Sequence, residues 1–182
     1  MAADETRQRS SPHGPTPSDD IRRVLVSRCI NGPPIRYNQT NVEVRSDIWD
    51  RWSQAGRLVP FCSELESGFA VPRPPAEILG GDASAVLTGR TPVLEDTGGD
   101  VTAMFLRGAE LAVAHAIEHG CVVAVLTDGS PSCGSTYTYD GSFTGGTVNG
   151  MGVTAKLLAD RGIPVFSESQ LEEADKILRA SG

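Results

Sequence analysis

A continuous apolar run, Cys121 to Leu126, lies between the strongest helical pattern of the chain and a polar loop that ends in a cysteine. Consecutive apolar residues suit a strand that is covered on both faces. The preceding segment, 101–119, has apolar residues at helical spacing, with Asp100 as its cap and Gly120 as its end. A helix followed by a fully buried strand is typical of parallel sheets, so this run indicates the α/β class.

Strand and helix patterns alternate along the rest of the chain. Strands are predicted at 21–27, 58–61 and 163–166, and helices at 47–54, 153–161 and 169–179. Ser46 caps the first helix, whose Trp49 and Trp52 are expected in the core, and Ser169 opens a capping box for the last helix. The order of elements predicts a single Rossmann-like α/β domain of three layers over 21–182, with a mainly parallel sheet.

Four segments do not fit this alternation. We predict an irregular loop at 66–82, short extended pieces at 86–88 and 92–94, and a glycine-rich loop at 134–152. Long loops of this kind are often functional. In the first of them, Arg73 and Glu77 are interpreted as a solvated pair, with the alternative that one of them faces a ligand.

The first 20 residues are rich in Pro, Ser, Asp and Arg, so we predict a disordered tail at 1–20. This segment has no apolar core that would make it a secretory signal. No apolar run approaches the ~20 residues that span a bilayer. The net charge of −7 argues against non-specific binding to nucleic acids or anionic membranes. We therefore expect a cytoplasmic protein with no membrane and no stable nucleic-acid partner.

Three of the four cysteines follow predicted strands at their carboxyl ends. Cys29 comes just after the first strand, Cys62 directly after the second, and Cys133 in the loop after the 121–126 strand. Ligands of parallel α/β sheets bind beyond these strand ends, so we expect the three thiols to converge. Cys121 lies at the other end of its strand, about 16 Å away at ~3.3 Å per residue, and is expected to be buried.

Three converging thiolates without a nearby histidine allow more than one interpretation. A structural zinc site normally has a fourth protein ligand. A cubane iron–sulfur cluster with three cysteines leaves one iron open as a Lewis acid. Ser63, Glu64, Ser130 and Ser132, which lie beside the cysteines, would then handle protons. The alternative is that the cysteines merely pack or lie exposed.

Several separated motifs resemble those of the thiouracil desulfurase family. They are VLVSRCINGPPIRYN at 24–38, GRLVPFCSE at 56–64, PRPPAEI at 72–78, SPSCG at 130–134, YDGSFTG at 139–145, GVTAKLL at 152–158 and GIPVFSE at 162–168. They extend over about residues 22–170 in the family's order. The resemblance is therefore carried by most of the chain.

The resemblance implies a 4Fe–4S cluster held by Cys29, Cys62 and Cys133, with one open iron that coordinates the thiocarbonyl sulfur. It implies a non-redox reaction in which the sulfur of a thiolated uracil, such as 4-thiouracil, is replaced by oxygen from water. Catalytic roles carry over to Glu64, two positions after the second cysteine, and to Ser130, which opens the SPSC run. The implied partners are a small thiolated pyrimidine and the iron–sulfur assembly machinery.

Three other functions compete with this interpretation. His115, Glu118 and His119 form an H-x-x-E-H motif, the inverted zinc-peptidase arrangement. The motif precedes the start of a strand, away from the expected functional edge, and a solvated helix end with histidines near its negative dipole explains it more simply. A non-catalytic iron–sulfur sensor or electron-transfer protein would have its fourth coordination position filled. A binding module without a cluster would use the glycine-rich edge of the sheet.

Overall fold

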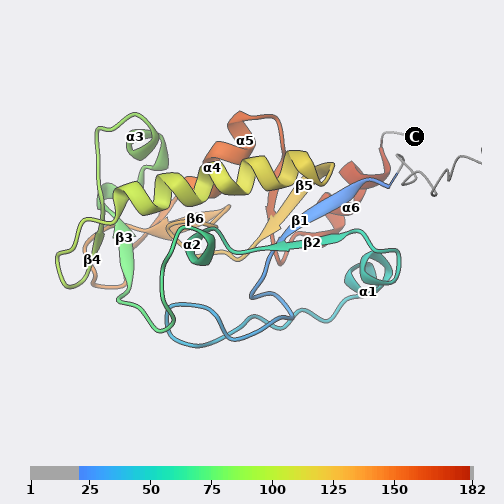
Figure 1. Cartoon of the computed structure of the whole chain (residues 1–182), viewed down its shortest axis with the longest axis horizontal. Coiled ribbons are helices and arrows are strands. Elements are labelled where there is room, and N and C mark those ends of the chain that lie inside the picture. The colour runs from blue at the N-terminus through green and yellow to red at the C-terminus, as the bar shows by residue number, and fades with distance from the viewer. Residues whose placement is uncertain (1–20, 181–182) are drawn as a thin grey trace, which may run out of the picture.

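The computed structural model describes residues 21–180, and its centre is a sheet of four parallel strands (Figure 1). The strands, in the order β2-β1-β5-β8, are Leu58–Phe61 (β2), Arg23–Ser27 (β1), Cys121–Leu126 (β5) and Val165–Ser167 (β8). The helices are Asp47–Gln54 (α1), Ser63–Glu66 (α2), Ala83–Leu87 (α3), Thr102–Glu118 (α4), Val153–Asp160 (α5) and Leu171–Arg179 (α6). The α/β fold with a mainly parallel sheet is confirmed. The predicted tail 1–20 lies outside the described residues.

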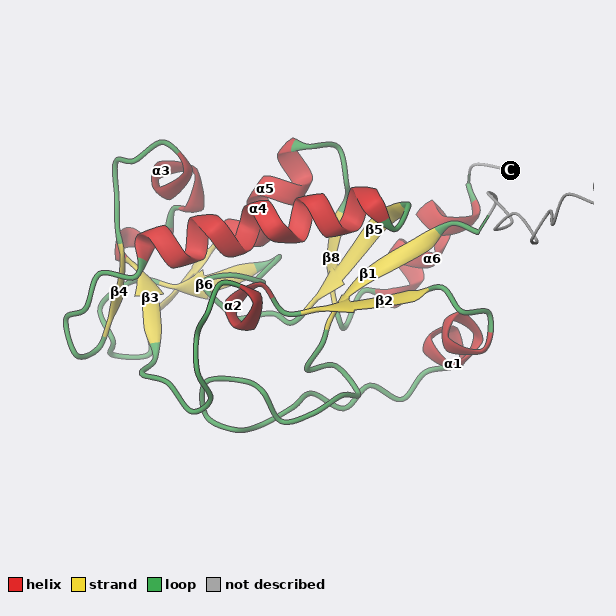
Figure 2. Ribbon diagram, viewed as in Figure 1, coloured by secondary structure: helices red, strands yellow, loops and turns green. Residues whose placement is uncertain are grey.

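Helices cover both faces of the sheet because its central strands are apolar on both sides (Figure 2). Val24 and Val123 pack against α1 and α6, where Trp52 fills the core, as predicted from the stripe of α1. Leu25 and Ala124 point the other way, toward α4 and α5. The three-layer arrangement therefore follows from the alternation of side chains along buried strands.

The long helices begin close to their predicted caps. Ser46 Oγ accepts a hydrogen bond from the backbone N–H of Ile48 at 3.2 Å. A carboxylate oxygen of Asp100 accepts from the N–H of Thr102, the first residue of α4, at 2.9 Å. Within 21–180, no helix has both the length and the apolar character needed to cross a membrane.

Small antiparallel sheets form largely within the segments predicted to be irregular, and the strand at 93–95 confirms the extended piece predicted at 92–94. Ala76–Ile78 (β3) pairs with Val93–Glu95 (β4), and Tyr137–Tyr139 (β6) pairs with Thr147–Asn149 (β7). Figure 2 shows β3, β4 and β6 at one end of the molecule, with α4 extending from there to the main sheet. The prediction of irregular structure throughout 66–82 and 134–152 is therefore wrong, because strands of three residues are too short for periodicity to reveal.

Two local predictions are also wrong. The extended piece expected at 86–88 falls mostly in α3, because Asp82 caps this helix by accepting a hydrogen bond from Ser84 N at 2.8 Å. The capping box at Ser169 does not form: its hydroxyl contacts Ser167 Oγ at 2.7 Å. The last helix instead follows Gln170, whose side-chain oxygen accepts from Ser167 N at 3.0 Å.

Asp175 of α6 is a buried carboxylate that joins α6 to α1. It accepts hydrogen bonds from Trp52 Nε1 and Arg51 Nη2, each at 2.9 Å, and pairs with Arg179. Because Asp175→Ala leaves a buried indole N–H without an acceptor, we expect the free energy of unfolding to fall by about 2–4 kcal/mol. Urea denaturation measures the change. Lys176→Ala, exposed on the same helix, should stay within about 0.5 kcal/mol of wild type; equal losses in both variants would contradict the role of Asp175.

Candidate active site

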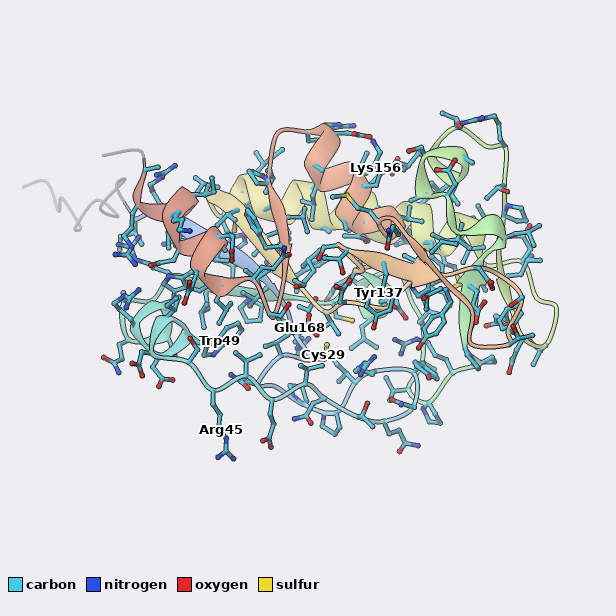
Figure 3. All side chains as sticks on the ribbon, turned by 180° about the vertical axis from the view of Figure 1, so that it is seen from behind. Cys29, Arg45, Trp49, Tyr137, Lys156 and Glu168 are labelled. Atoms are coloured by element: carbon cyan, nitrogen blue, oxygen red, sulfur yellow. The ribbon has the colours of Figure 1, made fainter. Side chains whose placement is uncertain are left out.

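The three cysteines that follow strands line one cavity of about 270 Å³. Cys29 follows β1, Cys62 lies between β2 and α2, and Cys133 follows β5. The cavity lies at the carboxyl ends of these strands. From β1 the chain continues to β2 on one side of the sheet, and from β5 it continues to β8 on the other side. The carboxyl edge at such a switch in strand order is the usual ligand site of open α/β sheets. Figure 3 shows Cys29 near the middle of the molecule, where the sheet meets the loops. The structure thus brings together the three thiols that strand order predicted.

Glu64 and Ser130 line the same cavity, whereas Cys121 does not. The Cys121 side chain is 7% exposed, at the opposite end of β5, and burial raises its pKa to about 12. It packs in the core between the sheet and α4, as predicted for the fourth cysteine.

All four cysteines are free thiols, and burial raises the pKa of each of the three at the cavity. The negative charge of Glu64 also raises the pKa of all three thiols. At Cys29 the hydroxyl of Thr127, whose Oγ1 lies 3.1 Å from Sγ, opposes this effect. The sulfurs are therefore protonated when no cation is near, and binding of a metal centre releases protons.

A rigid turn presents Cys133 to the cavity. Ser130 Oγ accepts hydrogen bonds from the N–H groups of Ser132 and Cys133, both at 3.1 Å. Gly129 has φ +69°, which favours glycine, and a Cβ on Gly134 would lie 2.5 Å from the carbonyl oxygen of Tyr137. The loop is therefore held in place before any ligand binds.

A chain of buried hydroxyls connects the neighbours of two of the cysteines. Ser63 Oγ, next to Cys62, lies 2.6 Å from Ser132 Oγ, next to Cys133. Ser132 Oγ in turn lies 2.8 Å from Thr154 Oγ1 in the first turn of α5. These bonds fix the Cys62 and Cys133 loops relative to each other.

Arg73 holds the carboxylate of Glu64 in place. Its Nε donates to Glu64 Oε2 at 2.7 Å, and the two side chains are only 7% and 16% exposed. Arg73 Nη1 also donates to the carbonyl oxygens of Ile35 and Ala70. The sequence does not reveal this ion pair, because a loop without a periodic pattern gives no sign that residues 64 and 73 meet.

The prediction that Arg73 and Glu77 form a solvated pair is wrong. Glu77 is 8% exposed, and its Oε2 accepts from the N–H groups of Gly141 at 2.9 Å and Phe143 at 3.1 Å. It therefore attaches the β6–β7 loop to β3. Both Arg73 and Glu77 also line the cavity, so the alternative interpretation, in which one of them faces a ligand, fits the structure better.

Asp128 organises the far side of the Cys133 loop. It accepts hydrogen bonds from the side chain of Thr136 and from the N–H groups of Ser135 and Thr136. Partial burial acts to raise the pKa of Asp128, but these hydrogen bonds outweigh it and hold that pKa below its usual value. The carboxylate form is therefore the one that stabilises the loop.

Asp128→Asn should lower the free energy of unfolding at neutral pH by about 1 kcal/mol, because an amide loses part of this acceptor set and partial exposure limits the effect. The folded-state pKa lies below the unfolded one, so the stabilisation is complete above about pH 4 and is lost as the pH falls through the folded pKa. Urea denaturation of both proteins from pH 7 down to about pH 3 should show the difference shrinking only at the acidic end. A difference that does not change with pH would contradict this assignment.

The histidine motif lies away from the cavity. His115, Glu118 and His119 lie in the last turn of α4 and just after it, next to the start of β5, and none of them lines the cavity. The structure therefore does not combine this motif with the cysteine site.

The donor set at the cavity fits an iron–sulfur cluster. Cysteine thiolates are the usual ligands of such clusters, and three free thiols line the cavity, with no histidine among the lining residues. A structural zinc site would need a fourth protein ligand. Cys121 is out of reach, and Glu64 is already paired with Arg73. Fold and site together define an α/β protein whose cavity suits a cluster with three protein ligands.

Comparisons with known proteins point to the same kind of cofactor. A family model described as 2-thiouracil desulfurase matches residues 24–170. YbbK of Bacillus subtilis (strain 168), an uncharacterized protein, is 39% identical over 150 residues, which are 82% of this chain and 98% of YbbK. The solved structure of TudS, a [4Fe-4S]-dependent thiouracil desulfidase, matches with a TM-score of 0.79 and 40% identity, over 87% of this chain and 99% of TudS.

The chain belongs to the 2-thiouracil desulfurase family. The resemblance drawn from its motifs is confirmed, and with it the prediction of an enzyme.

Proposed function

We propose that this protein removes sulfur from a thiolated uracil, such as 4-thiouracil, using a 4Fe–4S cluster bound by Cys29, Cys62 and Cys133. The observation that carries the proposal is the convergence of three free thiols, a carboxylate and a hydroxyl on one cavity. The cofactor dependence printed for TudS, at 40% identity, supports the choice of cluster.

The overall reaction replaces a C=S bond by a C=O bond. Water supplies the oxygen, the products are the oxo-pyrimidine and hydrogen sulfide, and no electrons are gained or lost. The bound cluster supplies an iron with a free coordination position, a soft Lewis acid for the thiocarbonyl sulfur. The remaining requirements are a base for water, a proton for the departing sulfur and a binding surface for the ring.

Glu64 is the base in this proposal. Nε and Nη2 of Arg73 both contact Glu64 Oε2, which leaves Oε1 available to take a proton from the attacking water. A carboxylate positioned in this way typically raises the rate of a reaction that requires proton transfer by about 10²–10⁴-fold. Arg73 keeps the carboxylate oriented and does not itself exchange protons.

Ser130 is the proton donor in this proposal. Its oxygen already accepts two backbone N–H bonds, so its own O–H remains free to donate. The residue lines the cavity, where its hydroxyl passes a proton to the departing sulfur and regains the one that Glu64 has taken from water, so that it ends neutral. The two hydrogen bonds by which Ser130 stabilises the turn are thus compatible with the catalytic role.

The cavity suits a small substrate. Its volume of about 270 Å³ is slightly below the usual range for small-molecule sites, and the cluster would share the space. Phe69, Pro75 and Tyr139 provide apolar surface for the faces of a pyrimidine ring. We infer that the substrate is a free small molecule, and that the protein works in a reducing cytoplasm, where the iron–sulfur assembly machinery loads the cluster.

Anaerobic purification, quantification of iron and acid-labile sulfide, and an assay of sulfide release from 4-thiouracil test the proposal. We expect about four irons per chain in the loaded protein and sulfide release that requires them. Absence of iron after reconstitution would exclude the cluster. An intact cluster that releases no sulfide from any thiolated uracil would favour the sensor or electron-transfer alternative. The zinc-peptidase alternative loses support, because the histidine motif does not line the cavity.

A further inference from the structure

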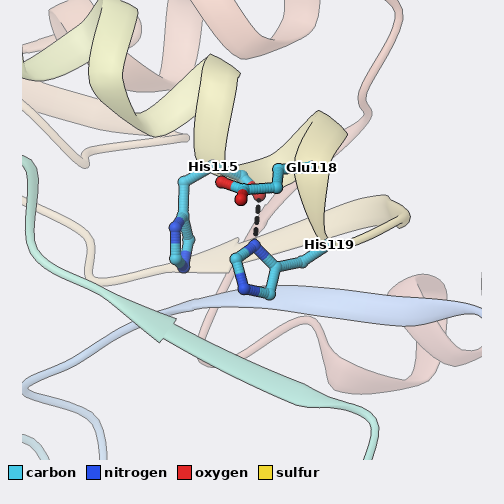
Figure 4. Close-up of side chains that lie close together, drawn as sticks. All are labelled: His115, Glu118 and His119. Carbon is cyan, nitrogen blue, oxygen red and sulfur yellow. Dashed lines mark hydrogen bonds between the residues drawn. The ribbon is translucent and has the colours of Figure 1, made fainter.

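A second group of metal-binding side chains lies at the end of α4, outside the cavity. His115, Glu118 and His119 each offer a ligand atom, and these atoms lie within 4.8 Å of one another. Figure 4 shows the two imidazole rings side by side at the end of the helix, with Glu118 next to them. Residues four apart share one helix face, so the two histidines form a natural pair of ligands.

The hydrogen bonding of His119 prepares its ring for a metal. Nδ1 of His119 lies 2.9 Å from the carbonyl oxygen of His115. A carbonyl oxygen only accepts, so Nδ1 carries the proton and Nε2 of the neutral ring presents a lone pair. Metal-binding histidines commonly have their second nitrogen fixed in this way.

The rings are held close to each other in the protein fold. The His115 and His119 centroids are 4.0 Å apart, and the His115 ring packs 4.8 Å from that of Phe61 on β2. Both histidines are half-buried. Little side-chain freedom is therefore lost when a cation joins the two rings.

The local charges favour a cation. The carboxyl end of a helix carries a partial negative charge, and the carboxylate of Glu118 lies with the two histidines. Arg23 opposes them, since its Nη1 donates to the carbonyl oxygen of His119 at 3.1 Å. A cation held between His115, Glu118 and His119 is therefore attracted by the helix end and by the Glu118 carboxylate.

We propose that His115, Glu118 and His119 form a site for one divalent transition-metal cation of the zinc type, separate from the cysteine cavity. Two imidazole nitrogens and one carboxylate oxygen are a common zinc ligand set, with water completing the coordination. All three ligands come from the end of α4, and the ring of His115 packs against Phe61 of β2. Metal binding stabilises the folded state. At metal concentrations above the dissociation constant, this stabilisation grows with the logarithm of the metal concentration.

Zinc titration of the cluster-loaded protein by anaerobic calorimetry tests this site, because the cluster keeps the cavity thiols occupied. We expect one Zn²⁺ per chain. Removal of the hydrogen-bond partner of a metal ligand typically lowers metal affinity by about tenfold or more. Removal of the ligand itself should lower the affinity at least as much, so we expect His115→Ala and His119→Ala each to weaken zinc binding about tenfold or more. Glu118→Gln should weaken it less. Glu110→Gln, exposed on the same helix, is the control and should bind as wild type.

A second measurement uses the wild-type protein, so it does not depend on whether a variant folds. The chain has three histidines, so NMR of the imidazole protons should show two of them responding to Zn²⁺, with His13 unchanged. Undiminished zinc binding by the His115→Ala/His119→Ala double variant, or no binding by the wild type, would overturn the proposal. Either result would leave the desulfurase proposal intact, since that one depends on iron content and sulfide release.

Discussion

Cys29→Ala, Cys62→Ala and Cys133→Ala should each abolish iron–sulfur binding, whereas Cys121→Ala should retain it. The cavity offers three thiols and no histidine, so removal of one leaves two protein ligands for a cluster that needs three. The neighbouring groups cannot take over: Glu64 is paired with Arg73, and hydroxyls are poor ligands for iron in a cluster.

Iron and acid-labile sulfide per chain, measured after anaerobic reconstitution, should be close to zero in the three variants and unchanged in Cys121→Ala. Cys121 is the matched control because it is the same residue type on the same strand as the Cys133 loop, but packed in the core. Its removal should cost only some stability. Full iron content in any of the three cavity variants, or its loss in Cys121→Ala, would show that the ligand set is different.

The convergence of the thiols was predictable because it depends on topology alone. The runs before Cys29, Cys62 and Cys133 are recognisable strands, and parallel strands bring their carboxyl ends to one edge. Cys121 opens β5 and, as predicted from strand direction, lies at the opposite end of that strand. No knowledge of side-chain conformation was needed.

The support for the site was not predictable, because it depends on contacts between irregular segments. Ser63 and Ser132 are 69 residues apart, and no periodic pattern indicates that their hydroxyls meet. Glu77 lies in a three-residue strand, too short to recognise, and its partners are backbone N–H groups of a loop. Backbone partners have no signature in the sequence. The sequence therefore predicts ligands at strand ends better than the residues that orient them.

Glu64→Gln should keep the cluster and lose most of its turnover. Glutamine has the shape of glutamate, and its side-chain oxygen still accepts from Arg73, so the geometry around Cys62 is preserved. The amide has no basic oxygen that would take a proton from water. We expect the rate of sulfide release from 4-thiouracil to fall by about 10²–10⁴-fold, the usual contribution of a general base.

Glu66→Gln is the matched control for this change. Glu66 lies two residues further along α2 and is exposed, so its replacement removes the same charge from the same helix without touching the cavity. Its rate should equal that of wild type, and both variants should contain as much iron as wild type. Because the ligand cysteines are unchanged, a fall in rate at full iron content locates the defect in proton transfer and not in cluster binding. A Glu64→Gln enzyme as fast as Glu66→Gln would mean that another group activates the water.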